Sequence, residues 1–209
     1  MIIEKLEVSP FASNCYIVGS ESTKEAIVID TGGEADRILS RIKGLGLKIK
    51  YIVLTHAHVD HIAAVKEVKA GTGAGIAIHA EDAKLLQSRS SDGAMFRLAW
   101  QEPPTPDRLL KGGDSIEIGE LKFLVLHTPG HTQGGICLFG EGVVFSGDTL
   151  FFFGIGRTDG PTGNYDQIIA SIQTKLMVLP EKTVVYPGHG PQTTIGMERR
   201  GNPFVGTLS

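Results

Sequence analysis

Four side chains that commonly bind metal ions lie within six positions, directly after an apolar run. They are His56, His58, Asp60 and His61, and the run at 50–54 before them predicts a buried strand. His56 and His58 are two positions apart, so an extended chain points both imidazoles to the same side, where both could bind one ion. Asp60 and His61 follow as the chain turns into a helix, and their changed direction suits a second ion. Zinc, iron and manganese all accept imidazole nitrogen and carboxylate oxygen as ligands.

Three further ligand-type residues occur downstream, each where a strand is predicted to end. His131 follows a Pro-Gly turn, Asp148 follows Gly147, and His189 follows a second Pro-Gly pair. Glycine lets the backbone turn tightly at such positions. Two ions with an open position for chemistry need more ligands than one loop can supply. Four strands that deliver His or Asp from their ends would gather all seven groups along one rim of a sheet assembly.

This order of residues resembles the metallo-β-lactamase superfamily of metallohydrolases. The resemblance covers nearly the whole chain and rests on His56-x-His58-x-Asp60-His61, followed by His131, Asp148 and His189. Carried over position by position, the family pattern assigns His56, His58 and His131 to a first metal ion. It assigns Asp60, His61 and His189 to a second ion, with Asp148 bridging both. The resemblance implies a four-layer αββα sandwich of the α/β (α+β) class and two divalent ions as cofactors, with zinc expected and iron or manganese as alternatives.

Asp148 and two short segments narrow the expected branch of the superfamily. A bridging Asp resembles the glyoxalase II, lactonase and RNA-processing branches, which disfavours lactam hydrolysis. The segments 156–159 and 198–203 resemble both single-domain glyoxalase II-like hydrolases and persulfide dioxygenases. We therefore expect a thioesterase of the hydroxyacylglutathione hydrolase type, with S-lactoylglutathione as the model substrate. The alternatives are a mononuclear iron persulfide dioxygenase, a hydrolase of other esters or lactones, and a non-catalytic scaffold, which would lack ligands.

The expected chemistry is attack of a metal-bridging hydroxide on the acyl carbon, with one ion polarising the carbonyl oxygen. Asp60 is the expected catalytic residue, because its carboxylate could orient that hydroxide. A thiolate leaves with little protonation, so neither a Ser or Cys nucleophile nor a separate general acid is required. Full-length glyoxalase II enzymes carry a C-terminal helical domain that helps to bind glutathione. Only about twenty residues follow His189 here, so the glutathione-contacting residues cannot be carried over.

Composition agrees with a single globular domain over residues 1–209. The chain has 41% hydrophobic and 21% charged residues, and its formal net charge of −3 offers no attraction to nucleic acid. Charged residues at positions 4, 5 and 7 interrupt any apolar signal core, and no apolar run approaches the length of a membrane span. These features predict a cytoplasmic enzyme with a small-molecule partner, without nucleic acid or membrane partners, and leave its oligomeric state open. Cys15 and Cys137 are expected to be small buried residues without a disulfide.

Hydrophobic patterning predicts a chain in which strands and helices occur in both halves. Strands are expected near 2–7, 14–19, 25–30, 50–54, 75–79, 115–118, 121–127, 135–139, 142–146 and 183–186. Helices are expected near 34–44, 61–70, from 81 onward and at 164–178. The stretch 88–106 between them is irregular and suggests a lid or a pocket wall, with packing onto the core as the alternative.

Several polar residues near the motifs are expected to support the site rather than to bind metal. Asp30 could lie behind a ligand His and fix its ring tautomer, or be a plain turn residue. His127 is expected to be structural and His79 to cap a helix or lie in the core. Arg157 and Asp159 are expected to form a structural pair. The run Phe151-Phe152-Phe153 is expected to be core with one exposed ring.

Overall fold

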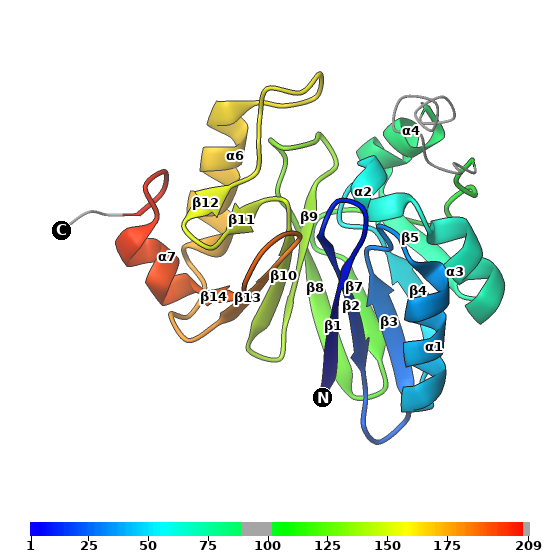
Figure 1. Ribbon diagram of the computed structural model, residues 1–209. Coiled ribbons are helices and arrows are strands. Elements are labelled where there is room, and N and C mark those ends of the chain that lie inside the picture. Colours follow the sequence, from blue (N-terminus) through cyan, green and yellow to red (C-terminus); the bar gives the residue numbers. More distant parts are fainter. Residues whose placement is uncertain (89–101, 207–209) are drawn as a thin grey trace. The chain divides into compact units, whose positions relative to one another are not determined.

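The computed structural model describes residues 1–88 and 102–206, which fall into two compact units. The first unit comprises Met1–Leu110 and Glu117–Leu121, and the second comprises Lys111–Ile116 and Lys122–Ser209. Each unit is built around one six-stranded sheet with helices beside it (Figure 1). Two sheets with helices are what the predicted α/β sandwich requires. The predicted lid at 88–106 lies largely outside the described residues.

The first unit contains a mixed sheet in the order β1-β2-β3-β4-β5-β6. Its strands are β1 (Ile2–Val8), β2 (Ser13–Gly19), β3 (Glu25–Ile29), β4 (Lys48–Val53), β5 (Gly75–His79) and β6 (Arg108–Leu110). The strands β1 to β3 pair antiparallel, and β3 to β6 pair parallel. Parallel strands are buried on both faces, which explains the nearly continuous apolar runs of β3 and β5.

Helices cover the parallel part of this sheet. They are α1 (Ala35–Leu45), α2 (Val59–Ile62), α3 (Val65–Thr72) and α4 (Ala80–Ser88). In α1 the buried residues Ile38 and Ile42 are one turn apart, so they face the sheet together. A single core cluster joins the sheet to α1, α3 and α4. This rigid base fixes the segment after β4 that carries the first group of candidate ligands.

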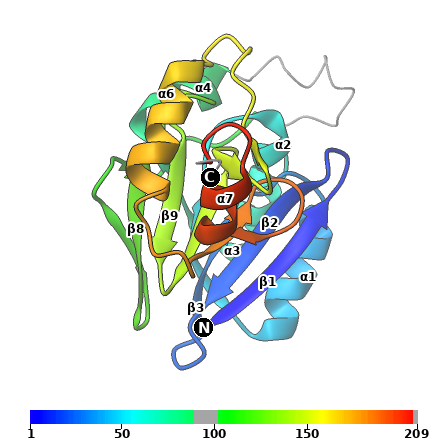
Figure 2. The ribbon, with the colours of Figure 1, turned by 90° about the vertical axis from the view of Figure 1, so that its left-hand side faces the viewer.

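The second unit contains a sheet in the order β14-β13-β10-β9-β8-β7. Its strands are β7 (Ser115–Ile118), β8 (Leu121–His127), β9 (Ile136–Gly140), β10 (Val143–Gly147), β13 (Val184–Pro187) and β14 (Thr193–Thr194). A small hairpin of β11 (Leu150–Phe151) and β12 (Gly154–Ile155) follows β10. The helices α6 (Tyr165–Ser171) and α7 (Ile195–Gly201) and the π-helix η2 (Ile172–Leu176) complete the unit. Figure 2 shows α6 running alongside β8 and β9, and one apolar cluster joins α6, η2 and α7 to the strands.

Two predicted helices are divided in the structure. The helix expected at 61–70 is two helices, because Ala64 leaves the helical conformation and its N–H donates to the Thr31 carbonyl at 2.8 Å. The helix expected at 164–178 becomes a π-helix after Ser171, where the Met177 N–H donates to the Ile172 carbonyl at 2.8 Å. Both expectations were wrong in detail, since tertiary contacts and a widened turn interrupt the helical period.

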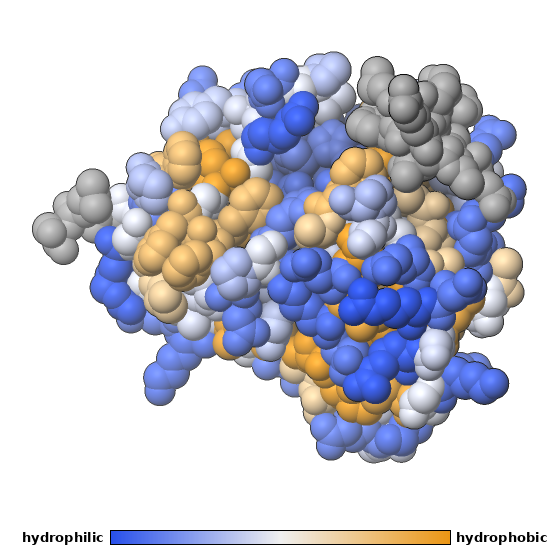
Figure 3. Space-filling model, viewed as in Figure 1, coloured by the Kyte–Doolittle hydropathy of each residue, from blue (hydrophilic) through white to orange (hydrophobic). Residues whose placement is uncertain are grey.

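The prediction for the three consecutive phenylalanines was also wrong. Phe152 and Phe153 are 42% and 41% exposed, and Phe151 is only partly buried. The residues lie in and between the two-residue strands β11 and β12, a hairpin too short to bury three rings. Figure 3, in the view of Figure 1, shows apolar surface over the region of β11, β12 and α7.

Both cysteines are buried and free, as predicted. Burial raises the pKa of the Cys137 thiol to about 11. Burial, with a smaller effect of the Asp30 carboxylate, raises the pKa of Cys15 well above its usual range. Because the thiolate is the reactive form, neither thiol is a nucleophile at neutral pH.

None of the helices formed by residues 1–88 and 102–206 combines the length and apolar character needed to cross a membrane.

Candidate metal centre

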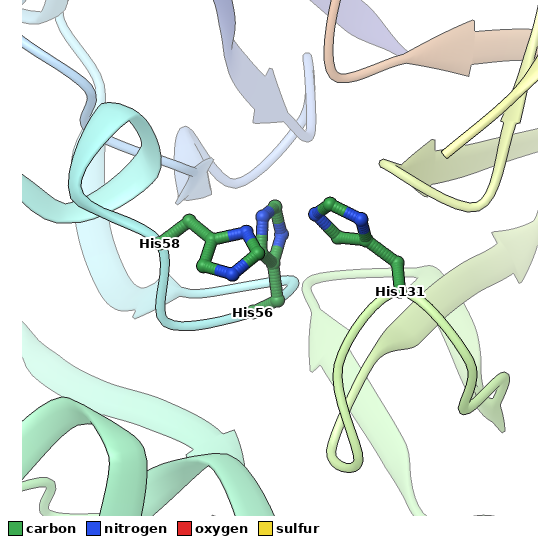
Figure 4. Close-up of side chains that lie close together, drawn as sticks. All are labelled: His56, His58 and His131. Carbon is green, nitrogen blue, oxygen red and sulfur yellow. The ribbon is translucent and has the colours of Figure 1, made fainter. Parts of the chain in front are cut away.

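The first group of candidate ligands lies on the segment between β4 and α2. His56 and His58 precede α2, for which His58 is the N-cap, and Asp60 and His61 lie within it. The His56 ring centroid is 4.8 Å from that of His58 and 4.2 Å from that of His61. Figure 4 shows the imidazoles of His56 and His58 next to each other on this segment. The predicted change from extended chain to helix between His58 and Asp60 is confirmed.

Asp30, at the end of β3, organises this group from behind. Its Oδ1 accepts the Thr55 N–H at 2.7 Å, and its Oδ2 accepts the Thr55 hydroxyl at 2.7 Å. The same Oδ2 accepts the Nδ1–H of His61 at 2.8 Å. Thr55 Oγ1 in turn lies 3.1 Å from Nδ1 of His56. Since the Thr55 hydroxyl donates its proton to Asp30, its oxygen accepts from His56, so one carboxylate sets both rings with Nδ1 protonated and Nε2 carrying the lone pair.

This arrangement favours the supporting role for Asp30 over the plain turn residue. Asp30, His56 and His61 place ligand atoms within 4.8 Å of one another, and all three residues are buried. The Asp30 carboxylate is occupied by three hydrogen bonds within its unit, which suits orientation of the histidines rather than metal binding. Its φ of 55° is in the left-handed region that Asp tolerates better than most residues.

The loop after Asp30 holds the ligand segment by close backbone contacts. The Thr31 N–H donates to the His61 carbonyl at 2.7 Å. A Cβ at Gly32 would lie 1.8 Å from the Asp60 carbonyl oxygen, a distance no side chain can occupy. Glycine is therefore required at this position so that the loop can lie directly against α2.

The second group of candidate ligands lies at strand ends in the second unit. His131 is in the turn after β8 (Figure 4), Asp148 follows β10, and His189 follows β13. Asp148 Oδ2 is 3.6 Å from Nε2 of His131 and 3.7 Å from Nε2 of His189. The predicted positions of these residues at strand ends are confirmed. Glycines at positive φ, Gly130 and Gly147, make the two turns before His131 and Asp148 possible.

The backbone after the hairpin fixes the ring of His131. Its Nδ1 donates to the Arg157 carbonyl at 2.8 Å, which leaves Nε2 with the lone pair. A Cβ at Gly156 would lie 1.8 Å from the Asp148 carbonyl oxygen, so glycine lets the segment after β12 lie directly against the segment that carries Asp148. The Phe151 ring meets the His189 ring edge-on, with centroids 6.2 Å apart.

The spacing of the ligand atoms fits divalent metal ions. Two atoms bound to one zinc at about 2.1 Å and a tetrahedral angle are about 3.4 Å apart. Asp60 Oδ2 and His61 Nε2 are 3.7 Å apart in the first unit, and the two pairs around Asp148 have nearly the same spacing. These separations exceed ordinary hydrogen bonds and are close to those of atoms that share an ion. His and Asp side chains with the spacing of metal ligands are therefore present in each unit.

The other polar residues near the motifs have supporting roles, as expected. His79 Nδ1 accepts the Glu81 N–H at 3.3 Å at the start of α4, and His127 Nε2 lies 2.9 Å from the Gln133 carbonyl. Arg157 and Asp159 form an ion pair at 3.1 Å, but both side chains are largely exposed. The pair is present, and its exposure makes it weak.

Two buried carboxylates near the ligands were missed by the sequence analysis. Asp82 in α4 accepts the Ala57 N–H at 2.9 Å, and Ala57 lies between the candidate ligands His56 and His58. Glu198 in α7 accepts the Phe153 N–H at 3.0 Å on the hairpin after Asp148. Glu198 begins the segment 198–203 that carries part of the resemblance, but each carboxylate is far in sequence from the backbone group that it accepts from, so the sequence did not predict either hydrogen bond.

Comparison with known families gives one match over most of the chain. A family model described as the metallo-β-lactamase superfamily matches residues 8–189, a range that includes all seven candidate ligands. The hydroxyacylglutathione hydrolase GloC of Haemophilus influenzae is 39% identical over 213 aligned residues, covering 100% of both chains.

Solved structures give the same result for the fold. The BLEG-1 B3 metallo-β-lactamase is 36% identical and matches with a TM-score of 0.90 over 98% of this chain and 99% of its own. TTHA1623 in a di-iron-bound form is 35% identical and matches with a TM-score of 0.87 over 96% of this chain and 99% of its own. The predicted fold is confirmed by these similarities.

Proposed function

This chain belongs to the metallo-β-lactamase superfamily, and from that premise we propose that it is a dinuclear metal-dependent hydrolase that cleaves an acyl thioester such as S-lactoylglutathione. The observation that carries the proposal is the 39% identity with GloC over the full length of both chains. GloC is aligned over its whole length, so it has no further domain outside the region that is similar to this chain. The activity in the name of GloC is thus proposed for this chain.

We propose that the two groups of candidate ligands form one centre. His56, His58 and His131 would hold one ion, Asp60, His61 and His189 would hold the other, and Asp148 would bridge them. Support comes from the position of Asp148, whose Oδ2 lies near Nε2 of both His131 and His189. Further support comes from the di-iron-bound form of TTHA1623. We propose zinc as the resident metal, with iron or manganese as alternatives, because His and Asp discriminate little among them.

When bound, two such ions supply a hydroxide nucleophile at neutral pH and polarise the acyl carbonyl. The residues of this chain supply positioning. Asp30 and the Arg157 carbonyl hold His56, His61 and His131 with Nε2 presented for binding. The Asp60 side chain is 26% exposed, so its carboxylate is accessible to a reactant and could accept a hydrogen bond that orients the nucleophile. The thiolate leaves without a general acid, and the high pKa values of both cysteines agree with a mechanism that needs no thiol nucleophile.

Lactam hydrolysis is the second candidate, because the BLEG-1 enzyme is similar over nearly the whole chain. The bridging Asp148, which resembles the glyoxalase II branch, favours the thioester. We also propose a cytoplasmic location, one catalytic domain over residues 1–209 and a small-molecule partner, with neither nucleic acid nor membrane as a partner.

The test is a competition between substrate classes. Zinc-loaded protein is assayed for hydrolysis of S-lactoylglutathione and a chromogenic cephalosporin, followed by absorbance, and of a simple lactone, followed by proton release with a pH indicator. We expect kcat/KM to be highest for the thioester. A higher value for the cephalosporin or the lactone would reject the thioester assignment. Metal-loaded protein that turns over none of the three, and instead consumes oxygen with glutathione persulfide, would identify the dioxygenase.

A further inference from the structure

The hairpin at residues 150–155 connects the three candidate ligands of the second unit. Asp148 lies just before β11, and Arg157, whose carbonyl accepts from Nδ1 of His131, lies just after β12. Within the hairpin, Phe151 packs edge-on against the His189 ring. A shift of this hairpin would therefore move Asp148 and the supports of His131 and His189 together.

The hairpin is too small to fix its own position. Only two residue pairs, Leu150 with Ile155 and Phe151 with Gly154, form its ladder. Phe153 at its tip has a φ of 51°, a conformation that a non-glycine residue adopts at a cost. The tip also exposes two aromatic rings to solvent. Something outside the hairpin must therefore hold it.

The carboxylate of Glu198, fully buried in α7, provides that hold. Its Oε2 accepts the Phe153 N–H at 3.0 Å and the Asn202 side-chain amide at 2.8 Å, and its Oε1 accepts the Thr193 hydroxyl at 2.7 Å. The same Asn202 amide donates to the Gly154 carbonyl at 3.1 Å. Phe153 at the tip of the hairpin and Gly154 at the start of β12 are thus tied to α7 through one carboxylate and one amide.

The shape of α7 fits the same role. A Cβ at Gly201 would lie 2.7 Å from the Phe153 ring, so glycine lets the tip of the hairpin lie directly on the helix. A buried carboxylate is a poor way to stabilise a core, because its desolvation costs more than packing an apolar side chain of similar volume. Its three donors come from β14, from the hairpin and from the end of α7. This distribution suits a residue that fixes the position of several segments.

We propose that Glu198 is a positioning residue for the metal centre: through Phe153 and Asn202 it holds the hairpin that sets Asp148, His131 and His189. The inference rests on the proposed function, since it requires that these three residues bind metal. The helix α7 follows the last candidate ligand and contributes none itself. Its contribution to the site is made through the hairpin.

The test compares Glu198→Gln with Glu181→Gln. Gln keeps the size of the side chain but offers one acceptor oxygen to three donors, so the hold on Phe153 is weakened. Glu181 forms exposed ion pairs with Arg199 and Arg200 of α7, the helix that also carries Glu198. Among the described hydrogen bonds, Glu181 has none with the hairpin. Zinc affinity is measured by competition with a chromophoric chelator, and the visible spectrum of the Co²⁺-loaded protein reports ligand geometry. Circular dichroism of the metal-free proteins establishes that each variant is folded.

We expect Glu198→Gln to lower zinc affinity by about 10- to 100-fold and to change the Co²⁺ spectrum. Glu181→Gln removes only exposed ion pairs and should change zinc affinity by less than about twofold. Unchanged zinc affinity and an unchanged spectrum in folded Glu198→Gln protein would overturn the proposal, however far its thermal midpoint falls. Should that variant not fold, Asn202→Ala is measured in its place and judged by the same two readouts, because it removes the tie to Gly154 and leaves the Phe153 contact. Wild-type protein that binds no metal would overturn the proposed function as well, so the two failures are distinguishable.

Discussion

Replacement of Asp148 by Ala will remove at least one metal ion and lower turnover of the thioester by about 10³-fold or more. Asp148 lies near Nε2 of both His131 and His189, so its loss takes a ligand from each ion of the proposed centre. Electrostatic stabilisation by a bound ion contributes several kcal/mol to a hydrolytic transition state, and each 1.36 kcal/mol corresponds to a factor of ten in rate. The measurements are metal content by elemental analysis and kcat for S-lactoylglutathione.

Asp159→Ala is the matched control for this prediction. Asp159 is an 80% exposed carboxylate shortly after the hairpin and pairs only weakly with Arg157. Its removal should leave both metal content and turnover close to the wild-type values. Turnover that survives Asp148→Ala within about tenfold would contradict the bridging role and the mechanism that depends on it.

Replacement of Asp30 by Ala will lower the free energy of unfolding of the metal-free protein by at least about 3 kcal/mol. Three buried donors, from the Thr55 backbone, the Thr55 hydroxyl and Nδ1 of His61, lose their acceptor. Each such donor costs about 1–3 kcal/mol when it is left unsatisfied. The positive φ at this position adds strain for Ala. Chemical denaturation of the apo-protein measures the change.

The same substitution should lower metal affinity by about 10- to 100-fold, because His56 and His61 lose the partner that sets their tautomers. Asp30→Asn provides a graded variant, since Asn tolerates the left-handed backbone and retains one acceptor oxygen. The free energy of unfolding and the metal affinity of Asp30→Asn should both lie between those of the wild type and of Asp30→Ala. Asp36→Ala, an exposed carboxylate in the first turn of α1, should cost less than about 1 kcal/mol. Equal stability of Asp30→Ala and Asp36→Ala would refute the supporting role of Asp30.

The sequence predicts those features that are expressed in local patterns. Apolar runs indicated the strands that precede the candidate ligands, and the Gly turns indicated that His131 and Asp148 lie at strand ends. Asp30 lies at the end of a predicted strand, so the sequence allowed two roles for it, support of a ligand His or a plain turn residue. The hydrogen bonds to Thr55 and His61 decide between these possibilities.

The parts that the sequence did not predict depend on contacts between distant segments. Asp82 and Glu198 accept hydrogen bonds from backbone groups 25 and 45 residues away, and no local spacing indicates which groups these are. The break at Ala64 depends on a bond to the Thr31 carbonyl. The strands β11, β12 and β14 have two residues each, too few to show an alternating pattern. For α7 a signal did exist, because Thr194 is a favourable N-cap residue before the helix.

The most direct test of the proposed dinuclear hydrolase is the number of metal ions bound per folded chain, measured by elemental analysis after saturation with zinc and removal of excess metal. Two ions per chain, with thioester turnover that requires both, is the result that the seven-ligand centre predicts. One ion per chain at saturation, with full thioester turnover or with oxygen consumption on glutathione persulfide, would contradict it.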